Sequence, residues 1–180
     1  MPVLMVRRCP VKLARGRQGG MVAAMDDEQY LRQAIALSRR HMEAGDGGPF
    51  GAVVVRGGRM LGEGWNQVTS ALDPTAHAEV VAIRMACLAV GDFALTGAVL
   101  YASCEPCPMC LAAAWWARVD AVVYAASRED AAVAGFDDAE LYREVQRPVE
   151  ERKLPCRQLL RGEAVAVFRA WLSKTDRIPY

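Results

Sequence analysis

The sequence is poor in histidine and lacks any long apolar run. Only His41 and His77 occur among its 180 residues, so a metal site that needs an imidazole must draw on these two. No apolar stretch approaches the roughly 18 to 20 residues that span a bilayer. The first 24 residues also lack the apolar stretch of a secretory signal. We therefore expect a soluble, cytoplasmic protein that makes no contact with a membrane.

Acidic residues are absent from residues 1–25, which contain five of the 22 basic residues. The rest of the chain then has 17 basic residues against 21 acidic ones, a net charge of −4. Such a body argues against binding to a nucleic-acid backbone, which selects a basic face. We interpret residues 1–24 as a basic extension, disordered or dispensable, or as the result of a start codon assigned too early. Residues 25–180 have the composition of one globular domain.

Cysteine pairs are absent outside one segment, "SCEPCPMC", which contains Cys104, Cys107 and Cys110. The other three cysteines are scattered, and without a secretory signal the thiols are expected to be reduced or to bind a metal. A ferredoxin-type cluster would need a fourth cysteine where Ala114 stands, and a four-cysteine zinc site would need a second close pair. A redox C-x-x-C motif is possible in principle, but it is expected beside a thioredoxin-like strand and helix. Zinc bound by two thiolates and one histidine fits the chain best.

The two histidines differ in their surroundings. His41 follows two arginines on the polar side of a predicted helix, and we interpret it as a solvated side chain. A lone helical histidine such as His77 is usually a core or capping residue. Glu79, two residues on in an apolar helix, favours a metal role for His77, because a buried carboxylate is costly without a nearby cation.

Pro106 distinguishes the three cysteines. Proline is favoured at the first position of a helix, so a helix from about 106 to 118 would place Cys107 and Cys110 on one face of its first two turns. The helix dipole and a metal would both favour their thiolate forms. Cys104 precedes this helix, and we predict that it does not bind the metal. Two thiolates and His77 would leave a fourth zinc position open to water, as in catalytic zinc sites.

The first half of the chain predicts two helices and a hairpin. Residues 26–44 have a helical apolar stripe, with acids at the start and a glycine at the end. Gly57 and Gly58 separate two β-rich runs, which predicts a tight hairpin. A second, buried helix is expected over 76–90, ending at Gly91.

The order of elements predicts an α/β fold with a mixed sheet. Residues 98–103 and 121–127 are short β runs on either side of the cysteine helix, and strands apolar on both faces indicate a sheet covered by helices. The last third predicts a short helix near 138–145, a strand near 154–160 and a helix over 163–174.

Two motifs in this order resemble the zinc-dependent cytidine/deoxycytidylate deaminase superfamily. The segment "HAE" at 77–79 and "PCPMC" at 106–110 match its H-x-E and P-C-x-x-C signature. Within the superfamily, "GGPFGAVVV", "GWNQVTSALDPTAHAEVVAIR", "AGFDDAELY" and the terminal Tyr180 resemble the bacterial guanine deaminases. The resemblance covers residues 26–180. It implies a three-layer α/β/α sandwich, one Zn²⁺ per subunit, hydrolysis of guanine to xanthine and ammonia, and a homodimer whose C-terminal segments exchange between subunits.

The resemblance also implies roles for single residues. Zinc would lower the pKa of a water, and Glu79 would take its proton and return protons to the ring nitrogen and the departing ammonia. Asp138 would contact the base and shuttle protons, although without the resemblance an aspartate there would be interpreted as the cap of the next helix. The remaining substrate contacts are assigned to Asn66, to Phe50, to the backbone N–H of Ala78 and to Tyr180 from the partner subunit. Without the resemblance, Asn66 would be interpreted as a turn residue and Phe50 as core.

Three alternatives stay open at this point. The tRNA adenosine deaminases share both motifs, but their RNA substrate requires a basic surface that this body lacks. Guanosine, cytosine or an aminotriazine could replace guanine as the substrate. A purely structural zinc module is the third alternative, against which Glu79 argues. The paired Trp115 and Trp116 are assigned to core or to dimer packing, with no preference.

Overall fold

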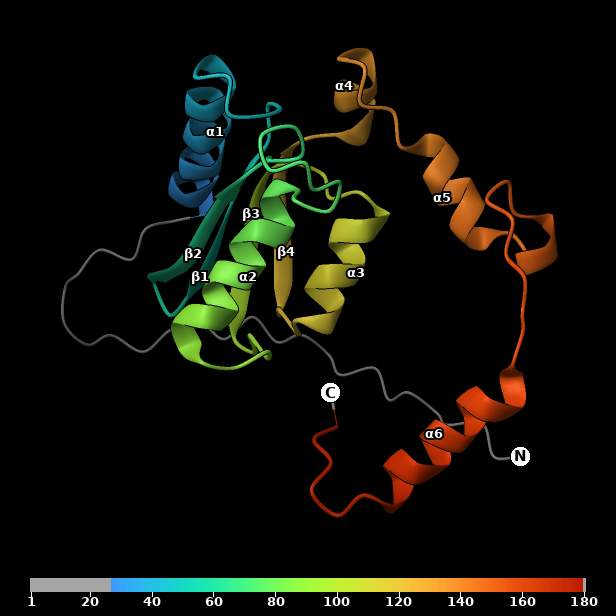
Figure 1. Cartoon of the computed structure of the whole chain (residues 1–180). Helices are drawn as coiled ribbons and strands as arrows, with labels where there is room; N and C mark the ends of the chain where they lie inside the picture. The colour runs from blue at the N-terminus through green and yellow to red at the C-terminus, as the bar shows by residue number, and fades with distance from the viewer. Residues whose placement is uncertain (1–26, 180) are drawn as a thin grey trace.

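A four-stranded mixed sheet forms the centre of the computed structural model, which describes residues 27–179 (Figure 1). Its strands lie in the order β2-β1-β3-β4. Their bounds are β1 Gly51–Arg56, β2 Arg59–Trp65, β3 Ala98–Cys104 and β4 Ala121–Ala126. Strand β1 pairs antiparallel with β2 and β3, and β3 pairs parallel with β4. The interpretation of residues 1–24 as an extension lies outside the described residues.

The predicted hairpin is confirmed. Gly57 and Gly58 connect β1 to β2 with φ angles of 59° and 80°, a region that residues with a side chain rarely adopt. The tight turn therefore places β2 at the edge of the sheet, next to β1.

Helices cover both faces of the sheet, which confirms the three-layer α/β/α prediction (Figure 1). Helix α1 (Asp27–Glu43) packs on one face, where Val53 and Val55 of β1 meet Tyr30 and Leu37. Helices α2 (Ala78–Val90) and α3 (Pro108–Trp116) pack on the other face. Because successive side chains of a strand point to opposite faces, β1 is apolar at nearly every position.

Two glycines of β2 bring α2 close to the sheet. A Cβ atom at Gly64 would lie 2.4 Å from the carbonyl oxygen of Ala78, and one at Gly62 would lie 2.6 Å from that of Ala82. Any side chain here would push the helix away. The close approach fixes the start of α2, and the helix ends as predicted at Gly91, which has a φ of 70°.

Helix α3 starts two residues later than predicted. Its first residue is Pro108, and Cys107 is the N-cap, so the proline at the favoured first position is Pro108 and not Pro106. The prediction that Cys104 precedes the helix holds, since Cys104 is the last residue of β3.

The C-terminal third differs from prediction in two places. Helix α4 (Arg128–Val133) was not predicted, although Ser127 and Asp130 form a capping box at its start. The strand predicted near 154–160 is wrong, because this segment is irregular. The predicted helices are present as α5 (Ala139–Gln146) and α6 (Arg161–Ser173), with a short 3-10 helix, η1 (Val149–Glu151), between them.

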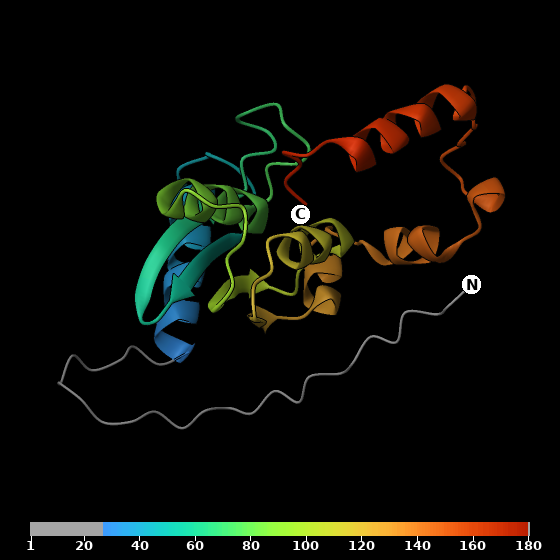
Figure 2. The same cartoon turned by 90° about the horizontal axis from the view of Figure 1, so that it is seen from below.

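Residues 139–179, called the C-terminal arm below, extend away from the sandwich, and α6 lies outside its layers in both views (Figure 1, Figure 2). A strand near 154–160 would need a neighbouring strand to pair with, and the arm does not run along the sheet. Most of its large apolar side chains are exposed, among them Leu159, Leu160, Val167, Phe168 and Leu172. Among the described residues, no helix is long and apolar enough to cross a membrane.

Candidate metal centre and cavity

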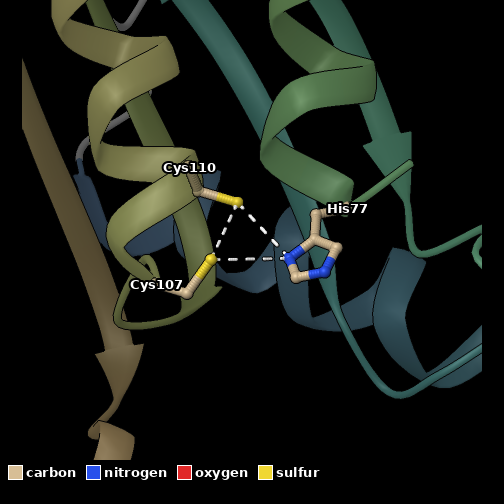
Figure 3. A group of neighbouring side chains, drawn as sticks. All are labelled: His77, Cys107 and Cys110. Atoms are coloured by element: carbon tan, nitrogen blue, oxygen red, sulfur yellow. Dashed lines mark hydrogen bonds between the residues drawn. The ribbon is translucent and has the colours of Figure 1, made fainter. Parts of the chain in front are cut away.

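Three potential metal ligands converge where the starts of α2 and α3 meet (Figure 3). His77 is the N-cap of α2, Cys107 is the N-cap of α3, and Cys110 lies in the first turn of α3. The His77 Nδ1 atom lies 3.6 Å from the Cys107 Sγ and 3.5 Å from the Cys110 Sγ, and the two sulfur atoms lie 3.6 Å apart. The three atoms thus form a nearly equilateral triangle.

This triangle has the dimensions of a zinc site. For Zn–S and Zn–N bonds of ordinary length, tetrahedral geometry places two sulfur ligands about 3.8 Å apart and a sulfur and a nitrogen about 3.6 Å apart. The observed separations agree with these values to within about 0.2 Å. Among the described residues, this is the one group of three or more histidine, cysteine and acidic side chains close enough to share an ion.

His77, Cys107 and Cys110 share protons through their mutual hydrogen bonds, and a bound cation would take the place of these protons. Hydrogen bonds from Cys110 and His77 lower the pKa of the Cys107 thiol to about 4. The same contact with Cys107 raises the pKa of His77, and that of Cys110 is raised as well. Negative charge is therefore concentrated on the Cys107 sulfur and stabilised by the protons of His77 and Cys110, which a divalent cation would displace.

Glu79 lies in the first turn of α2 and is only 7% exposed. Burial raises the pKa of its carboxyl group, and the negative charge of Cys107 raises it further. A buried carboxyl group with a raised pKa at the edge of a cavity is suited to carrying a proton in both directions.

A cavity of about 590 Å³ opens above this group, and His77, Glu79 and Cys107 contribute to its lining. Phe50, Asn66 and Asp138 line it too, so the structure brings three of the sequence-predicted substrate residues to one space. Ligand pockets of roughly 300–1,000 Å³ hold small organic molecules, so a single purine fits with room to spare.

Asn66 follows β2 just before a turn, as the unaided sequence suggested, but it is buried, with 8% of its surface exposed. Its Oδ1 atom accepts hydrogen bonds from the backbone N–H groups of Gly48 at 3.4 Å and Val68 at 3.3 Å. The oxygen is therefore directed at the backbone, which leaves the amide NH₂ group as the part of Asn66 that can donate to a ligand in the cavity.

Phe50 meets a second aromatic ring, that of Phe136, which was not predicted to belong to the site. The Phe50 and Phe136 ring centroids lie 4.9 Å apart at 87°, and both rings line the cavity. Phe136 belongs to the segment "AGFDDAELY", from which only Asp138 was selected. The edge-to-face contact makes one apolar wall from two distant parts of the chain.

Asp138 is the N-cap of α5, but its side chain makes no capping hydrogen bond. It lines the cavity instead, and its pKa is raised by partial burial and then by the negative charge of Cys107. The structural alternative, a helix cap, is therefore not what the side chain does.

The other selected residues lie outside the metal group. The Cys104 thiol donates to the Ser127 carbonyl oxygen at 3.5 Å, and burial raises the pKa of Cys104 to about 11. Ala78 is buried and is the first residue of α2, so its N–H belongs to the helix turn whose donors have no partner within the helix. Tyr180 lies outside the described residues. The interpretation of His41 as solvated is wrong, because its side chain is only 12% exposed.

Trp115 and Trp116 at the end of α3 are not core residues. They are 81% and 60% exposed, so the core alternative is wrong for both. Large exposed indoles on a helix are typical of surfaces that another chain covers.

Comparisons with known proteins agree with this site. The family model of the cytidine and deoxycytidylate deaminase zinc-binding region matches residues 24–126, more than half of the chain. The guanine deaminase of Bacillus subtilis is 49% identical over 156 residues, which are 87% of this chain and all of that protein. The X-ray structure of a guanine deaminase from Bacillus subtilis superposes with a TM-score of 0.84, covering 87% of this chain and 99% of the other. The tRNA-specific adenosine deaminase of Bacillus subtilis is 40% identical over 100 residues, 56% of this chain and 62% of that protein.

Proposed function

The chain belongs to the cytidine and deoxycytidylate deaminase zinc-binding family, and we propose that it hydrolyses guanine to xanthine and ammonia. The observation that carries this proposal is the buried Glu79 carboxyl group beside a three-ligand metal group in a cavity of purine size. The similarity to a guanine deaminase over that protein's whole length supports guanine in particular, because it extends into the C-terminal arm, beyond the part that the family model matches.

His77, Cys107 and Cys110 would hold one Zn²⁺ per subunit, with the fourth position left to water. When bound, zinc supplies a Lewis acid that lowers the pKa of this water toward neutrality. Two thiolates balance the charge of the ion, and the histidine completes a three-ligand site of the catalytic type.

Glu79 is proposed as the group that moves protons. It takes one proton from the attacking water, whose oxygen adds to C2 of guanine, and passes this proton to the ring nitrogen. It then takes the proton of the new hydroxyl group and gives it to the departing amino group, so that the carbonyl group of xanthine forms. One water is consumed, the C2–N bond breaks, and ammonia leaves. Asp138, which lines the same cavity, would assist the proton transfers and contact the base.

The base itself would be held by groups from separate loops. The NH₂ group of Asn66 would donate to an acceptor on the purine, and the Ala78 N–H would donate a second hydrogen bond. Phe50 would lie against the ring, and Tyr180 would close the pocket from the partner subunit. Exclusion of water from such a pocket strengthens each of these polar contacts.

We further propose a cytoplasmic homodimer in which the C-terminal arms exchange. The support is the exposed apolar surface on both parts: Phe168 and Leu172 on α6, and Trp115 and Trp116 on α3. Apolar surface of this extent is rarely left open on a monomer. A chain cut after residue 138 should then be monomeric and inactive by light scattering and ammonia release, while the full chain is a dimer.

The test of the activity is ammonia release from guanine, guanosine, adenine, cytosine, cytidine and tRNA, with zinc content measured on the same preparations. Release from guanine far above the other substrates is the expected result. Inosine formation in tRNA, with salt-sensitive RNA binding and no activity on guanine, would replace the proposed substrate by an anticodon adenosine.

A further inference from the structure

His41 lies near the end of α1 in a small cluster that no proposed step uses. Its imidazole stacks on the indole of Trp65, with ring centroids 3.7 Å apart and planes 5° apart. Its Nδ1 atom lies 2.8 Å from a carboxylate oxygen of Asp46. Because Trp65 ends β2 and Asp46 follows α1, the cluster joins an edge strand to the loop that leaves the first helix.

The hydrogen bonds of His41 define its tautomer. The Arg40 guanidinium donates to Nε2 at 3.0 and 3.3 Å, which requires Nε2 to be an acceptor. The ring proton must then be on Nδ1, where it is donated to Asp46. A neutral imidazole thus satisfies both partners while it stacks on Trp65.

Asp46 is held at two further points. Its N–H donates to the His41 carbonyl oxygen at 2.9 Å, and its own carbonyl oxygen accepts from the Ser70 hydroxyl at 2.7 Å. With the side-chain bond to His41, these contacts tie Asp46 both to α1 and to the segment that follows Asn66 along the chain.

The loop after Asp46 lies directly against Asn66. A Cβ atom at Gly47 would lie 1.7 Å from the Asn66 carbonyl oxygen, so only glycine fits there. The next residue, Gly48, donates its N–H to the Asn66 Oδ1, and Asn66 in turn donates its N–H to the Phe50 carbonyl oxygen at 3.0 Å. A shift of Asp46 would therefore be transmitted through two residues to the carboxamide.

We propose that His41 and Asp46 position the Asn66 carboxamide for the bound base, with Trp65 as the platform on which His41 is stacked. The inference rests on the proposed function, because it assumes that Asn66 contacts the substrate. His41 and Asp46 are positioning residues, since neither lines the cavity. They act on binding of the base and leave the metal group and Glu79 unchanged.

The test is a double-mutant cycle with Asn66. Asp46→Ala removes the acceptor for His41, Asp46→Asn keeps an oxygen acceptor, and His41→Phe keeps a ring on Trp65 without the hydrogen bond. Each is made in the wild-type chain and together with Asn66→Ala, and kcat, KM, zinc content and the thermal midpoint are measured. Arg39→Ala is the matched control, because Arg39 is on the same helix and its side chain is 73% exposed.

Asp46→Ala and His41→Phe are expected to raise KM about tenfold with little change in kcat, and Asp46→Asn to restore most of the loss. In the Asn66→Ala background, the same substitutions should have almost no further effect on KM. Should Asp46→Ala fail to fold, Asp46→Asn and His41→Phe still complete the cycle.

Equal effects in both backgrounds would overturn the inference, as would an Asp46→Asn variant as impaired as Asp46→Ala. A fall in kcat and zinc content without a change in KM would also overturn it, since it would place the effect at the metal. These outcomes are distinct from failure of the proposed function, which is a wild-type chain inactive on guanine. The cycle is then measured with the base from which the wild type does release ammonia.

Discussion

Replacing Glu79 by glutamine is expected to abolish turnover while the metal site and the fold persist. Glutamine has the size of glutamate, and as a neutral amide it is less costly to bury than a carboxylate, so the thermal midpoint should not fall. The carboxyl group, 7% exposed beside the metal group, is the buried acid placed to take and return protons there. A positioned acid or base contributes about 10²- to 10⁴-fold to a rate, and a group used in successive transfers should lie at the upper end of this range. A loss of ~10⁴ in kcat corresponds to about 5 kcal/mol of transition-state stabilisation.

The assay is coupled detection of ammonia, run beside metal analysis of the same protein. Glu63→Gln, on the exposed side of β2, is the matched control and should keep wild-type kcat and KM. The KM of Glu79→Gln should stay within about threefold of the wild type, because the amide removes a proton carrier and not a binding surface. A Glu79→Gln variant with zinc bound and a kcat within tenfold of the wild type would exclude Glu79 as the proton carrier.

Three further predictions concern the metal ligands, Cys104 and Asp138. The Cys104→Ser variant should keep its zinc, because burial holds the Cys104 thiol neutral, whereas Cys107→Ser should lose at least tenfold in zinc affinity. Metal analysis after dialysis against a chelator distinguishes the two variants. Zinc binding requires a neutral His77, and the pKa of His77 in the metal-free chain is raised above the usual value of about 6.5 for histidine, so protons begin to compete with zinc above that pH. The zinc affinity, measured by competition with a chelator, should therefore decline as the pH falls below neutrality and recover when the pH is raised again. An affinity that stays constant down to about pH 5 would contradict this. Asp138→Asn should lower kcat about 10²-fold with zinc retained, and an unchanged kcat in the ammonia assay would return Asp138 to a structural role.

Local patterns in the sequence predicted the elements that hold the metal group. The spacing of His77 and Glu79 at the start of an apolar helix, and of Cys107 and Cys110 around a proline, needs no information from elsewhere in the chain. Helix N-termini are positions that sequence can identify, because caps and prolines are local. The two-residue error at α3 arose because two prolines flank Cys107 and only one can be the first helical residue.

Tertiary contacts decided what the sequence could not predict. His41 follows two arginines, which predicts exposure, but Leu37 lies four residues before it on the same face of α1 and is buried. The stacking partner, Trp65, is 24 residues away and could not be predicted from these neighbours. The segment 154–160 has the apolar composition of a strand but no neighbouring strand, so it stays irregular. For α6, the apolar pattern predicts a helix correctly but does not distinguish a face buried in its own chain from a face that another chain covers.

The cavity has a metal end and a set of loop walls, and this division explains why the reaction type could be predicted more firmly than the identity of the substrate. Its metal end is built from two helix starts, which carry His77, Glu79 and the two cysteines within a few residues of each other. Most of its remaining lining comes from the loops near 47–50, 66–69 and 135–138, which the fold brings together from three separate regions. Substitutions in these loops can reshape the wall and redirect the Asn66 amide without touching a metal ligand or Glu79. Relatives that share both motifs can therefore share the hydrolytic step and differ in the base they accept. In this chain, the orientation of the Asn66 amide is the feature through which substrate preference can be tested most directly.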